Sequence, residues 1–302
     1  MSGDARAGAY RASRRSAVVA RATLRRDPER NSPMTFTGKT IVITGASDGI
    51  GAELARQLAA DRPTLVLAAR TASRLDEVAG ACRANGARVL VVPTDVTRDE
   101  DCRALADAAV REGGGIDVLV NNAGISMHAR FGDIEDFSTF ERLWRVNCLG
   151  TVQCTRHAYP HLVARRGLVV GVSSLAGKTG VPARTTYCAS KFAQTGFLEA
   201  LRIEAADRGV AVLIAYPGVV ATDIRRRGLD ARGETAGFSG LEERGAMAVD
   251  ECARQIVAAM RRRRRELVMT PQGKVGMWLK LIAPGLVDRM ARAALARDER
   301  GQ

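Results

Sequence analysis

The chain has 302 residues, 46% of them hydrophobic and 26% charged, which excludes a disordered or collagen-like protein. No apolar run approaches the ~20 residues of a membrane-spanning helix, and six scattered cysteines without a C-x-x-C pair favour reduced thiols over a disulfide framework. A formal net charge of +13 raises the hypothesis of a nucleic-acid partner.

That charge belongs to the two ends of the chain. Residues 1–33 hold eight arginines against three acidic residues, and residues 261–302 hold eleven basic residues against four acidic ones. The stretch between them is therefore nearly neutral. Aromatic residues, which would stack on bases, make up only 4% of the chain. We therefore predict no nucleic-acid partner.

Residues 1–33 lack apolar periodicity, and we expect a disordered basic tail there. The tail is either a transit peptide or the product of a start assigned upstream of Met34. From Phe36 onward, buried strands alternate with amphipathic helices. The predicted strands are Thr40–Thr44, Leu65–Ala69, Val89–Val92, Asp117–Val120, Leu168–Val172, Val210–Ala215 and Leu267–Met269. The predicted helices are Ile50–Ala60, Ser73–Cys82, Glu100–Arg111, Phe137–Ala164 (one helix or two abutting ones), Ala189–Ala206 and Val249–Met260.

This alternation predicts an α/β fold, a single-domain Rossmann-like doubly wound parallel sheet with helices on both faces. The catalytic domain would span residues 34–270, and residues 271–302 would form a basic amphipathic C-terminal extension.

The first strand runs into T-G-A-S-D-G-I-G at 44–51. Gly45, Gly49 and Gly51 would permit a tight turn and close approach of a pyrophosphate, which the following helix N-terminus favours. The alternative, a glycine-rich turn without a ligand, is weakened by its position after the first strand of a βαβ unit.

The second strand ends at Ala69-Arg70, without the acidic residue that would bind an NAD ribose. Arg70 offers a planar cation suited to a 2′-phosphate, so we favour NADP(H) over NAD(H). The alternative is that Arg70 is a solvated arginine in an arginine-rich chain. Asp48 in the turn adds no second basic contact.

Tyr187 and Lys191 stand four residues apart on a predicted helix, with Ser174 just past a strand. An ammonium next to a phenol, like the positive charge of an oxidised nicotinamide, would lower the phenol pKa. Ser174 would hold a carbonyl against Tyr187, which would exchange a proton while hydride passes to or from a nicotinamide. Cys188 is interpreted as a packing residue, and His157 and His161 do not predict a metal site.

Together these motifs resemble the short-chain dehydrogenase/reductase family over residues 36–260. They include D-V at 95–96, N-N-A-G at 121–124, V-N-C-L-G around Asn147, V-S-S-L-A-G at 172–177, Y-C-A-S-K at 187–191 and P-G at 217–218. The stretches S-S-L-A-G-K and Y-C-A-S-K-F-A look most like the 11β-hydroxysteroid dehydrogenase-like, lipid-handling branch.

The resemblance implies an NAD(P)(H)-dependent enzyme acting on CH–OH and carbonyl groups. Asn147, Ser174, Tyr187 and Lys191 would be catalytic, with Asn147 holding a water that links Lys191 to a proton relay. The implied cofactor-binding residues are Thr44, Gly45, Ser47, Gly49, Ile50, Gly51, Arg70, Asp95, Val96, Asn121, Ala123, Gly124, Tyr187, Lys191, Pro217, Gly218, Val219 and Thr222.

We expect a small hydrophobic substrate, because Ile125, Met127, Val219 and Phe238 would surround the mouth of the site with few charges. The segment 228–245 would cover it as a mobile loop. The competing hypothesis is a non-catalytic NADP(H)-binding scaffold or sensor, which the intact catalytic set opposes.

After Leu267–Met269, an apolar stripe broken at Pro284-Gly285 is flanked by basic residues. This pattern suits a helix pair on the cytoplasmic face of an anionic membrane. The alternatives are a dimer interface or a flap over the substrate pocket. We expect a cytoplasmic homo-oligomer.

Overall fold

The computed structural model describes residues 33–237 and 245–298, with the side chains of the last two residues left out. The expected disordered tail and Phe238 lie outside the described residues. The chain divides into two units, Met1–Pro33 and Met34–Gln302, and the described helices and strands belong to the second.

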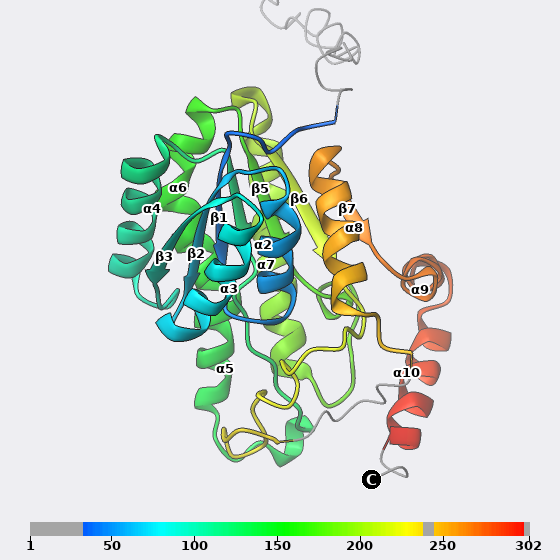
Figure 1. Cartoon of the computed structure of the whole chain (residues 1–302). Helices are drawn as coiled ribbons and strands as arrows, with labels where there is room; N and C mark the ends of the chain where they lie inside the picture. Colours follow the sequence, from blue (N-terminus) through cyan, green and yellow to red (C-terminus); the bar gives the residue numbers. More distant parts are fainter. Residues whose placement is uncertain (1–32, 238–244, 299–302) are drawn as a thin grey trace, which may run out of the picture. The chain divides into compact units, whose positions relative to one another are not determined.

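Within the described residues the strands form one seven-stranded sheet of order β3-β2-β1-β4-β5-β6-β7 (Figure 1). Every neighbouring pair in it is parallel. The strands are β1 (Thr40–Thr44), β2 (Thr64–Ala69), β3 (Arg88–Pro93), β4 (Val118–Asn121), β5 (Leu168–Val172), β6 (Ala211–Tyr216) and β7 (Glu266–Val268). This arrangement confirms the predicted fold class.

Helices cover both faces of the sheet (Figure 1). Ile41 and Ile43 pack with α2 (Gly49–Ala59), α3 (Ala72–Ala84) and α8 (Val249–Arg261). Val42 points to the other face and packs with α4 (Asp99–Gly113), α6 (Gly150–Ala164) and α7 (Thr185–Glu204). Because successive side chains of a strand face opposite sides, strands covered on both faces read as continuous apolar runs.

The region predicted as one long helix or two abutting ones is interrupted. It consists of α5 (Ser138–Leu143), a π-helical segment η3 (Trp144–Leu149) and α6. Such wide turns are frequent at functional sites, and η3 contains Asn147. An apolar pattern of period 3.6 does not distinguish this turn from an α-helix.

Most predicted boundaries shift by one or two residues, and the start of α7 shifts by four. Helix α7 begins at Thr185 and not at Ala189, so Tyr187 lies in its first turn. Strand β4 begins at Val118, and the carboxylate of Asp117 just before it accepts hydrogen bonds from Thr40 N and Lys39 Nζ, both 3.0 Å long. Strand β7 ends at Val268. The remaining short elements are η2 (Phe131–Asp133), η4 (Leu175–Gly177) and η5 (Ala206–Arg208).

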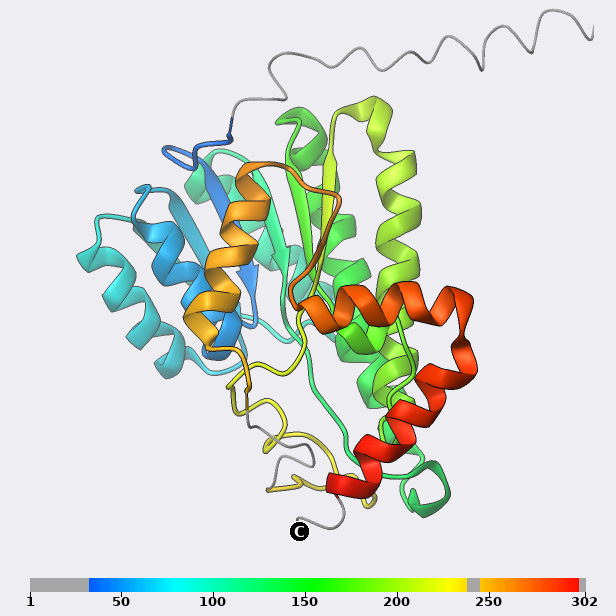
Figure 2. The ribbon, with the colours of Figure 1, turned by 90° about the vertical axis from the view of Figure 1, so that its right-hand side faces the viewer.

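The C-terminal extension forms two helices, α9 (Pro271–Ile282) and α10 (Pro284–Asp298), which lie beside the sheet layers (Figure 2). Thr270 caps α9, its hydroxyl accepting a 3.1 Å hydrogen bond from Gly273 N. Neither these two nor any other helix among the described residues combines the length and apolar character needed to cross a membrane.

Candidate active site

A glycine-containing turn connects β1 to α2. Gly45 and Gly49 have φ values of +63° and +52°, a region that side chains disfavour. A Cβ on Gly45 would lie 2.8 Å from Ala123 Cα, so only glycine fits there. The first turn of α2 contains no acidic residue. Asp48 is the N-cap residue, but its side chain forms no capping hydrogen bond with the helix. The first amide groups of α2 are therefore available to an anion.

Two polar side chains fix this turn. Asn122 Nδ2 donates to the carbonyl oxygens of Thr44 and Gly45, each at 3.0 Å. Thr44 Oγ1 accepts from Asn122 N at 3.0 Å and from Ala123 N at 3.1 Å. Thr44 therefore positions the turn and does not itself line the cavity. Asn122, which belongs to the N-N-A-G motif, also holds the turn and in addition lines the neighbouring cavity.

A cavity of about 590 Å³ opens at the carboxyl ends of the strands, where β1 and β4 are neighbours. Ligands bind at this switch point in doubly wound sheets. Its volume lies within the roughly 300–1,000 Å³ of typical ligand sites. Its wall includes the predicted cofactor residues Gly45, Ser47, Gly49, Ile50, Arg70, Asp95, Val96, Ala123, Gly124 and Thr222. The glycine cradle, free helix amides and cavity size fit a nicotinamide dinucleotide.

The other predicted cofactor residues do not form the wall. Asn121 is buried and donates to Thr155 Oγ1 at 3.0 Å. Gly51 packs beneath the Gly45 carbonyl. The Pro217 carbonyl accepts from Leu175 N, and the Val219 carbonyl accepts from Met247 N, both at 2.9 Å. The remaining members of this group are Thr44, Tyr187, Lys191 and Gly218.

The expectation of few charges is wrong for the cavity as a whole. Arginine side chains line it at Arg70, Arg74, Arg142, Arg145 and Arg227. Four of them have protein partners nearby: Arg74 and Arg227 pair with Asp48, Arg145 pairs with Glu141 at 2.8 Å, and Arg142 donates to the Gly233 carbonyl at 2.8 Å. The sequence missed this because the arginines come from separate segments of the chain.

A basic group gathers around Asp48, at the end of the cavity formed by the turn and by β2. Arg227 forms an ion pair with Asp48, and Arg74 Nη1 lies 3.8 Å from Asp48 Oδ2. Arg70 lines the same cavity. Asp48 itself adds no basic contact, as expected from the sequence, but Arg227 and Arg74 from other segments lie next to it. Arg74 and Arg227 could not be identified from the turn motif, since they lie on α3 and on the 219–237 segment.

The reactive residues Ser174 and Tyr187 meet beside this cavity. Ser174 follows β5, and its Oγ accepts from Ala176 N at 3.2 Å. Tyr187 is buried, and its hydroxyl interacts with the side chain of Ser174, which partly offsets the effect of burial on the Tyr187 pKa. It packs in an apolar cluster with Met127, Leu143 and other side chains. A carbonyl oxygen held between the two hydroxyls could accept both hydrogen bonds.

Burial raises the pKa of Tyr187, and its hydrogen bond with Ser174 only partly opposes this. The expectation that the Lys191 ammonium lowers the pKa of Tyr187 is therefore wrong for the protein's own groups. Lys191 Nζ lies 6.0 Å from the centre of the Tyr187 ring and donates instead to Val172 O and Gln194 Oε1, each at 3.1 Å. Tyr187 accordingly carries its proton at neutral pH, as an acid that protonates a carbonyl oxygen must.

Lys191 starts a buried polar chain that the sequence did not reveal. Gln194 Nε2 donates to Thr151 Oγ1 at 2.9 Å, and Thr151 Oγ1 donates to the Asn147 carbonyl at 3.1 Å. Lys191 and Asn147 also converge on the cavity wall. A Cβ on Gly124 would lie 3.5 Å from Lys191 Nζ and 3.1 Å from Asn147 Oδ1.

The amide of Asn147 is fully engaged within the protein. Its Oδ1 accepts from Ile125 N at 2.8 Å, and its Nδ2 donates to Ile125 O at 3.0 Å and Ser190 Oγ at 2.9 Å. Ser190 Oγ in turn donates to the Tyr187 carbonyl at 2.8 Å. Asn147 therefore ties the π-helical turn to the cavity wall and to the first turn of α7.

Burial also lowers the pKa of Lys191, from 10.5 to about 8. Below pH 8 the folded and unfolded states are both protonated, and the cost of the buried charge is present in full. Between pH 8 and 10.5 the folded state loses the proton first, so the free energy of unfolding rises with pH. Relative to a Lys191→Met variant, wild type should gain about 2 kcal/mol between pH 7 and pH 9.5.

Urea unfolding of both proteins at the two pH values measures this difference, in which titrations common to both cancel. Lys274→Met is the matched control, because Lys274 is exposed on α9. If the free energies of unfolding of wild type and Lys191→Met differed by the same amount at both pH values, this result would contradict the buried-charge account.

The parallel sheet, the glycine turn at its switch point and the Ser174–Tyr187 pair define a nucleotide-dependent oxidoreductase. The family model described as short chain dehydrogenase matches residues 39–232. The chain therefore belongs to the short-chain dehydrogenase family and is a dehydrogenase/reductase.

Relatives agree with this assignment. The chain is 32% identical over 273 residues to a "Dehydrogenase/reductase SDR family protein 7-like" of Dictyostelium discoideum, covering 88% of this chain and 83% of that protein. It is 36% identical over 261 residues to an "11-beta-hydroxysteroid dehydrogenase" of Pinus massoniana, covering 83% and 72%. The resemblance to 11β-hydroxysteroid dehydrogenase-like proteins is thus confirmed at modest identity.

Two solved structures share the fold. An alcohol dehydrogenase from Thermococcus sibiricus, complexed with 5-hydroxy-NADP, matches with a TM-score of 0.68 at 26% identity, covering 76% of this chain and 95% of that one. A short-chain dehydrogenase/reductase from Burkholderia phymatum, in complex with NAD, matches with a TM-score of 0.74 at 25% identity, covering 84% and 96%. The neighbours therefore include both an NADP-type and an NAD complex.

Proposed function

We propose that this enzyme uses NADP(H) to interconvert an alcohol and a ketone or aldehyde on a hydrophobic, lipid- or steroid-like substrate. The carrying observation is the pairing of the partly buried Ser174 side chain with the buried Tyr187 hydroxyl beside a cavity of nucleotide size. Apolar side chains at the inner end of this cavity support a hydrophobic substrate. Ile125 and Leu229 line the wall, and Leu229 packs in the cluster around Tyr187.

The chain's own residues have distinct roles in this proposal. Ser174 donates a hydrogen bond to the carbonyl oxygen of the substrate and orients it. Tyr187 transfers the proton to that oxygen in reduction or removes it in oxidation. Lys191, through Gln194 and Thr151, supplies the buried end of a hydrogen-bonded chain that ends at the Asn147 carbonyl. A bound nicotinamide dinucleotide would donate or accept the hydride.

The experiment is a hydride-transfer screen. Purified protein is assayed with NADPH and NADH against aldehydes, ketosteroids, retinal and 3-oxoacyl thioesters. We expect turnover of at least one apolar carbonyl, faster with NADPH. Absence of turnover with either nucleotide, together with intact nucleotide binding, would instead favour the non-catalytic scaffold or sensor.

The preference for NADP(H) rests on the basic group around Asp48. Arg70, Arg74 and Arg227 line one cavity, and a charge-assisted hydrogen bond to a phosphate contributes about 1.5–3 kcal/mol. Arg70→Ala should therefore raise the dissociation constant for NADPH by about 10- to 100-fold and leave that for NADH nearly unchanged. Fluorescence titration with each nucleotide measures both constants.

Arg103→Ala is the matched control, because Arg103 is an exposed arginine on α4 that does not belong to the cavity wall. If Arg70→Ala and Arg103→Ala shift the NADPH constant equally, Arg70 is only a solvated arginine. A double variant with Arg74→Ala would then show whether the second guanidinium recognises the phosphate.

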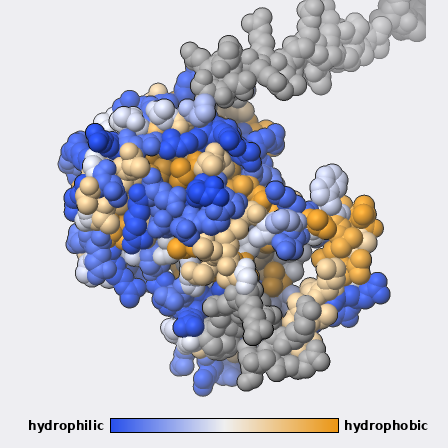
Figure 3. Space-filling view, turned by 45° about the vertical axis from the view of Figure 1, so that its right-hand side comes forward, coloured by the Kyte–Doolittle hydropathy of each residue, from blue (hydrophilic) through white to orange (hydrophobic). Residues whose placement is uncertain are grey.

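We also propose that α9 and α10 contact an anionic membrane surface. Large apolar side chains on them are strongly exposed: Val275 65%, Trp278 73%, Leu281 77% and Ile282 80%. Figure 3 shows this apolar surface along the C-terminal helices. The exposed basic residues Lys274, Arg289 and Arg292 lie on the same helices. The test is co-sedimentation with vesicles, and we expect binding to anionic but not to neutral ones. Binding to neither kind of vesicle would contradict the proposal.

A further inference from the structure

A second cavity lies between the segment 179–182 and the facing sides of α9 and α10. Its volume is about 260 Å³. We call it the C-terminal groove, and it is separate from the nucleotide cavity. Its lining residues are Thr179, Gly180, Val181, Pro182, Gly276, Leu279, Val287, Met290, Ala291, Ala294 and Leu295.

The groove is apolar and has open space within it. In this part of the described chain no charged side chain lines it, and the Thr179 hydroxyl is the one polar side-chain group. A Cβ added at Gly180 or Gly276 would meet no atom within 4 Å. Small residues thus face one another where larger ones would close the space. Sugars, nucleotides and amino acids would lose their hydrogen bonds here, whereas a hydrocarbon would not.

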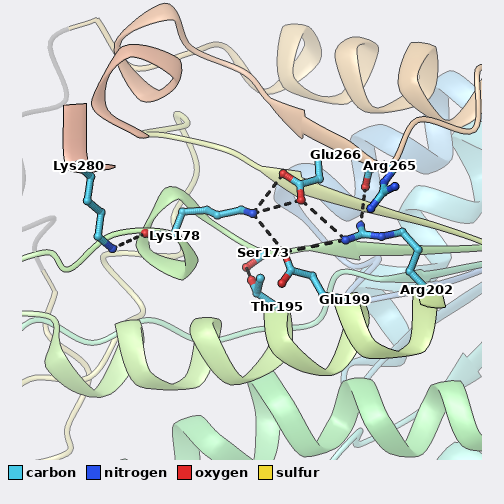
Figure 4. Close-up of polar contacts among 8 residues, drawn as sticks. All are labelled: Ser173, Lys178, Thr195, Glu199, Arg202, Arg265, Glu266 and Lys280. Carbon is cyan, nitrogen blue, oxygen red and sulfur yellow. Dashed lines mark hydrogen bonds and ion pairs between the residues drawn. The ribbon is translucent and has the colours of Figure 1, made fainter. Parts of the chain in front are cut away.

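A polar contact joins α9 to the segment that follows η4. Lys280 Nζ donates to the Lys178 carbonyl at 2.9 Å and lies 5.4 Å from the centre of the Phe192 ring. Lys178 is itself held, its Nζ lying 3.3 Å from Glu199 Oε1 and 3.2 Å from Glu266 (Figure 4). Because Lys178 follows η4, this contact connects α9 to the segment that contains Ser174.

The groove also borders the surroundings of Tyr187. Val181 lines the groove and packs against the apolar cluster that contains Tyr187 and Cys188. Val181 N donates to Cys188 Sγ at 3.3 Å, which fixes this dividing segment next to the reactive tyrosine. The groove therefore adjoins the surroundings of Tyr187, and Val181 contacts both.

We propose that the C-terminal groove binds the aliphatic chain of the substrate, so that the substrate is a long-chain alkyl carbonyl or alcohol and not a rigid fused ring. A cavity of about 150 Å³ holds benzene, so this larger one accommodates several methylene groups. The exposed Leu286 and Met290 extend the apolar surface to solvent. This inference rests on the proposed oxidoreductase function and adds the substrate class.

The test uses straight-chain aldehydes from four to fourteen carbons with NADPH, as a series of about six compounds. In wild type, kcat/KM should rise about two- to fourfold for each methylene that enters the groove and then level off. Ala294→Trp, which fills the groove, should flatten this rise. Ala293→Trp is the matched control, because Ala293 is the exposed neighbour on α10, and it should keep the wild-type rise.

A second groove-filling variant and a binding measurement guard against misfolding. Gly276→Leu fills the opposite wall, where open space receives the new side chain. Binding of 11-(dansylamino)undecanoic acid, followed by its fluorescence, should weaken at least about tenfold in Ala294→Trp and Gly276→Leu but not in Ala293→Trp. Thermal unfolding of each variant verifies the fold.

Three outcomes would overturn the inference. The first is a wild-type rate that does not depend on chain length, although short aldehydes are reduced. The second is a rise that survives both groove-filling variants. The third is a change in mass by light scattering in Ala294→Trp but not in Ala293→Trp, which would make a second copy of the chain the occupant. Failure of the proposed function differs from all three, since no aldehyde would then be reduced while the probe would still report on the groove.

Discussion

Replacing Tyr187 by phenylalanine should lower kcat/KM for carbonyl reduction by about 10²- to 10⁴-fold, the usual contribution of a positioned acid–base group. The variant loses only the hydroxyl that hydrogen-bonds with Ser174, while the ring stays in its apolar cluster. The dissociation constant for NADPH should change by less than about twofold, because Tyr187 does not line the nucleotide cavity. Steady-state kinetics and fluorescence titration measure the two quantities.

Tyr159→Phe is the control for this prediction. Tyr159 lies on α6, is partly buried and packs in the core on one face of the sheet, away from Ser174. The control should keep wild-type kinetics. Activity of Tyr187→Phe within tenfold of wild type would remove Tyr187 from the proton transfer and leave Ser174 or a solvent molecule as the acid.

The fold was predictable because each part of it depends on local patterns. Continuous apolar strands such as Leu168–Val172 are buried on both faces, and amphipathic helices must cover them. The glycine turn could be located for the same reason. The φ of +63° at Gly45 and the close approach of Ala123 require glycine, and that requirement is visible in the sequence.

The site was only partly predictable, because several of its groups meet through the tertiary fold. Arg227 reaches Asp48 from 179 residues away, and Gln194 meets Thr151 across two helices. Neither pair has a spacing that a motif could reveal. The sequence showed that Tyr187 and Lys191 share a helix face, but not that burial would dominate their pKa values.

The dependence on tertiary structure also explains why the charged residues lining the cavity were not predicted from the sequence. Counting residues near the motifs finds Ile125 and Met127, which follow the N-N-A-G motif closely in the chain. It does not find Arg142 and Arg145, which α5 and η3 bring to the cavity. The proposal of a lipid-like substrate therefore rests on the inner, apolar end of the cavity and on the C-terminal groove, and not on the absence of charge.

Gly51 gives the second large expected effect, on stability and nucleotide binding together. A Cβ at this position would collide with the Gly45 carbonyl and lie 2.5 Å from Asn122 Nδ2. These atoms belong to the turn and to the side chain that fixes it, so α2 or the turn must move. Gly51→Ala should therefore lower the free energy of unfolding by about 3 kcal/mol or more. It should also weaken NADPH binding at least about tenfold.

Gly80→Ala is the matched control, because it makes the same substitution inside another helix. A Cβ on Gly80 meets no atom within 4 Å, and alanine is preferred over glycine in a helix interior. Gly80→Ala should raise the free energy of unfolding by about 0.5–1 kcal/mol and leave NADPH binding unchanged. Urea unfolding and fluorescence titration of both variants measure these effects. If Gly51→Ala were as stable as Gly80→Ala and bound NADPH equally well, close packing of α2 against the turn would not shape the nucleotide site.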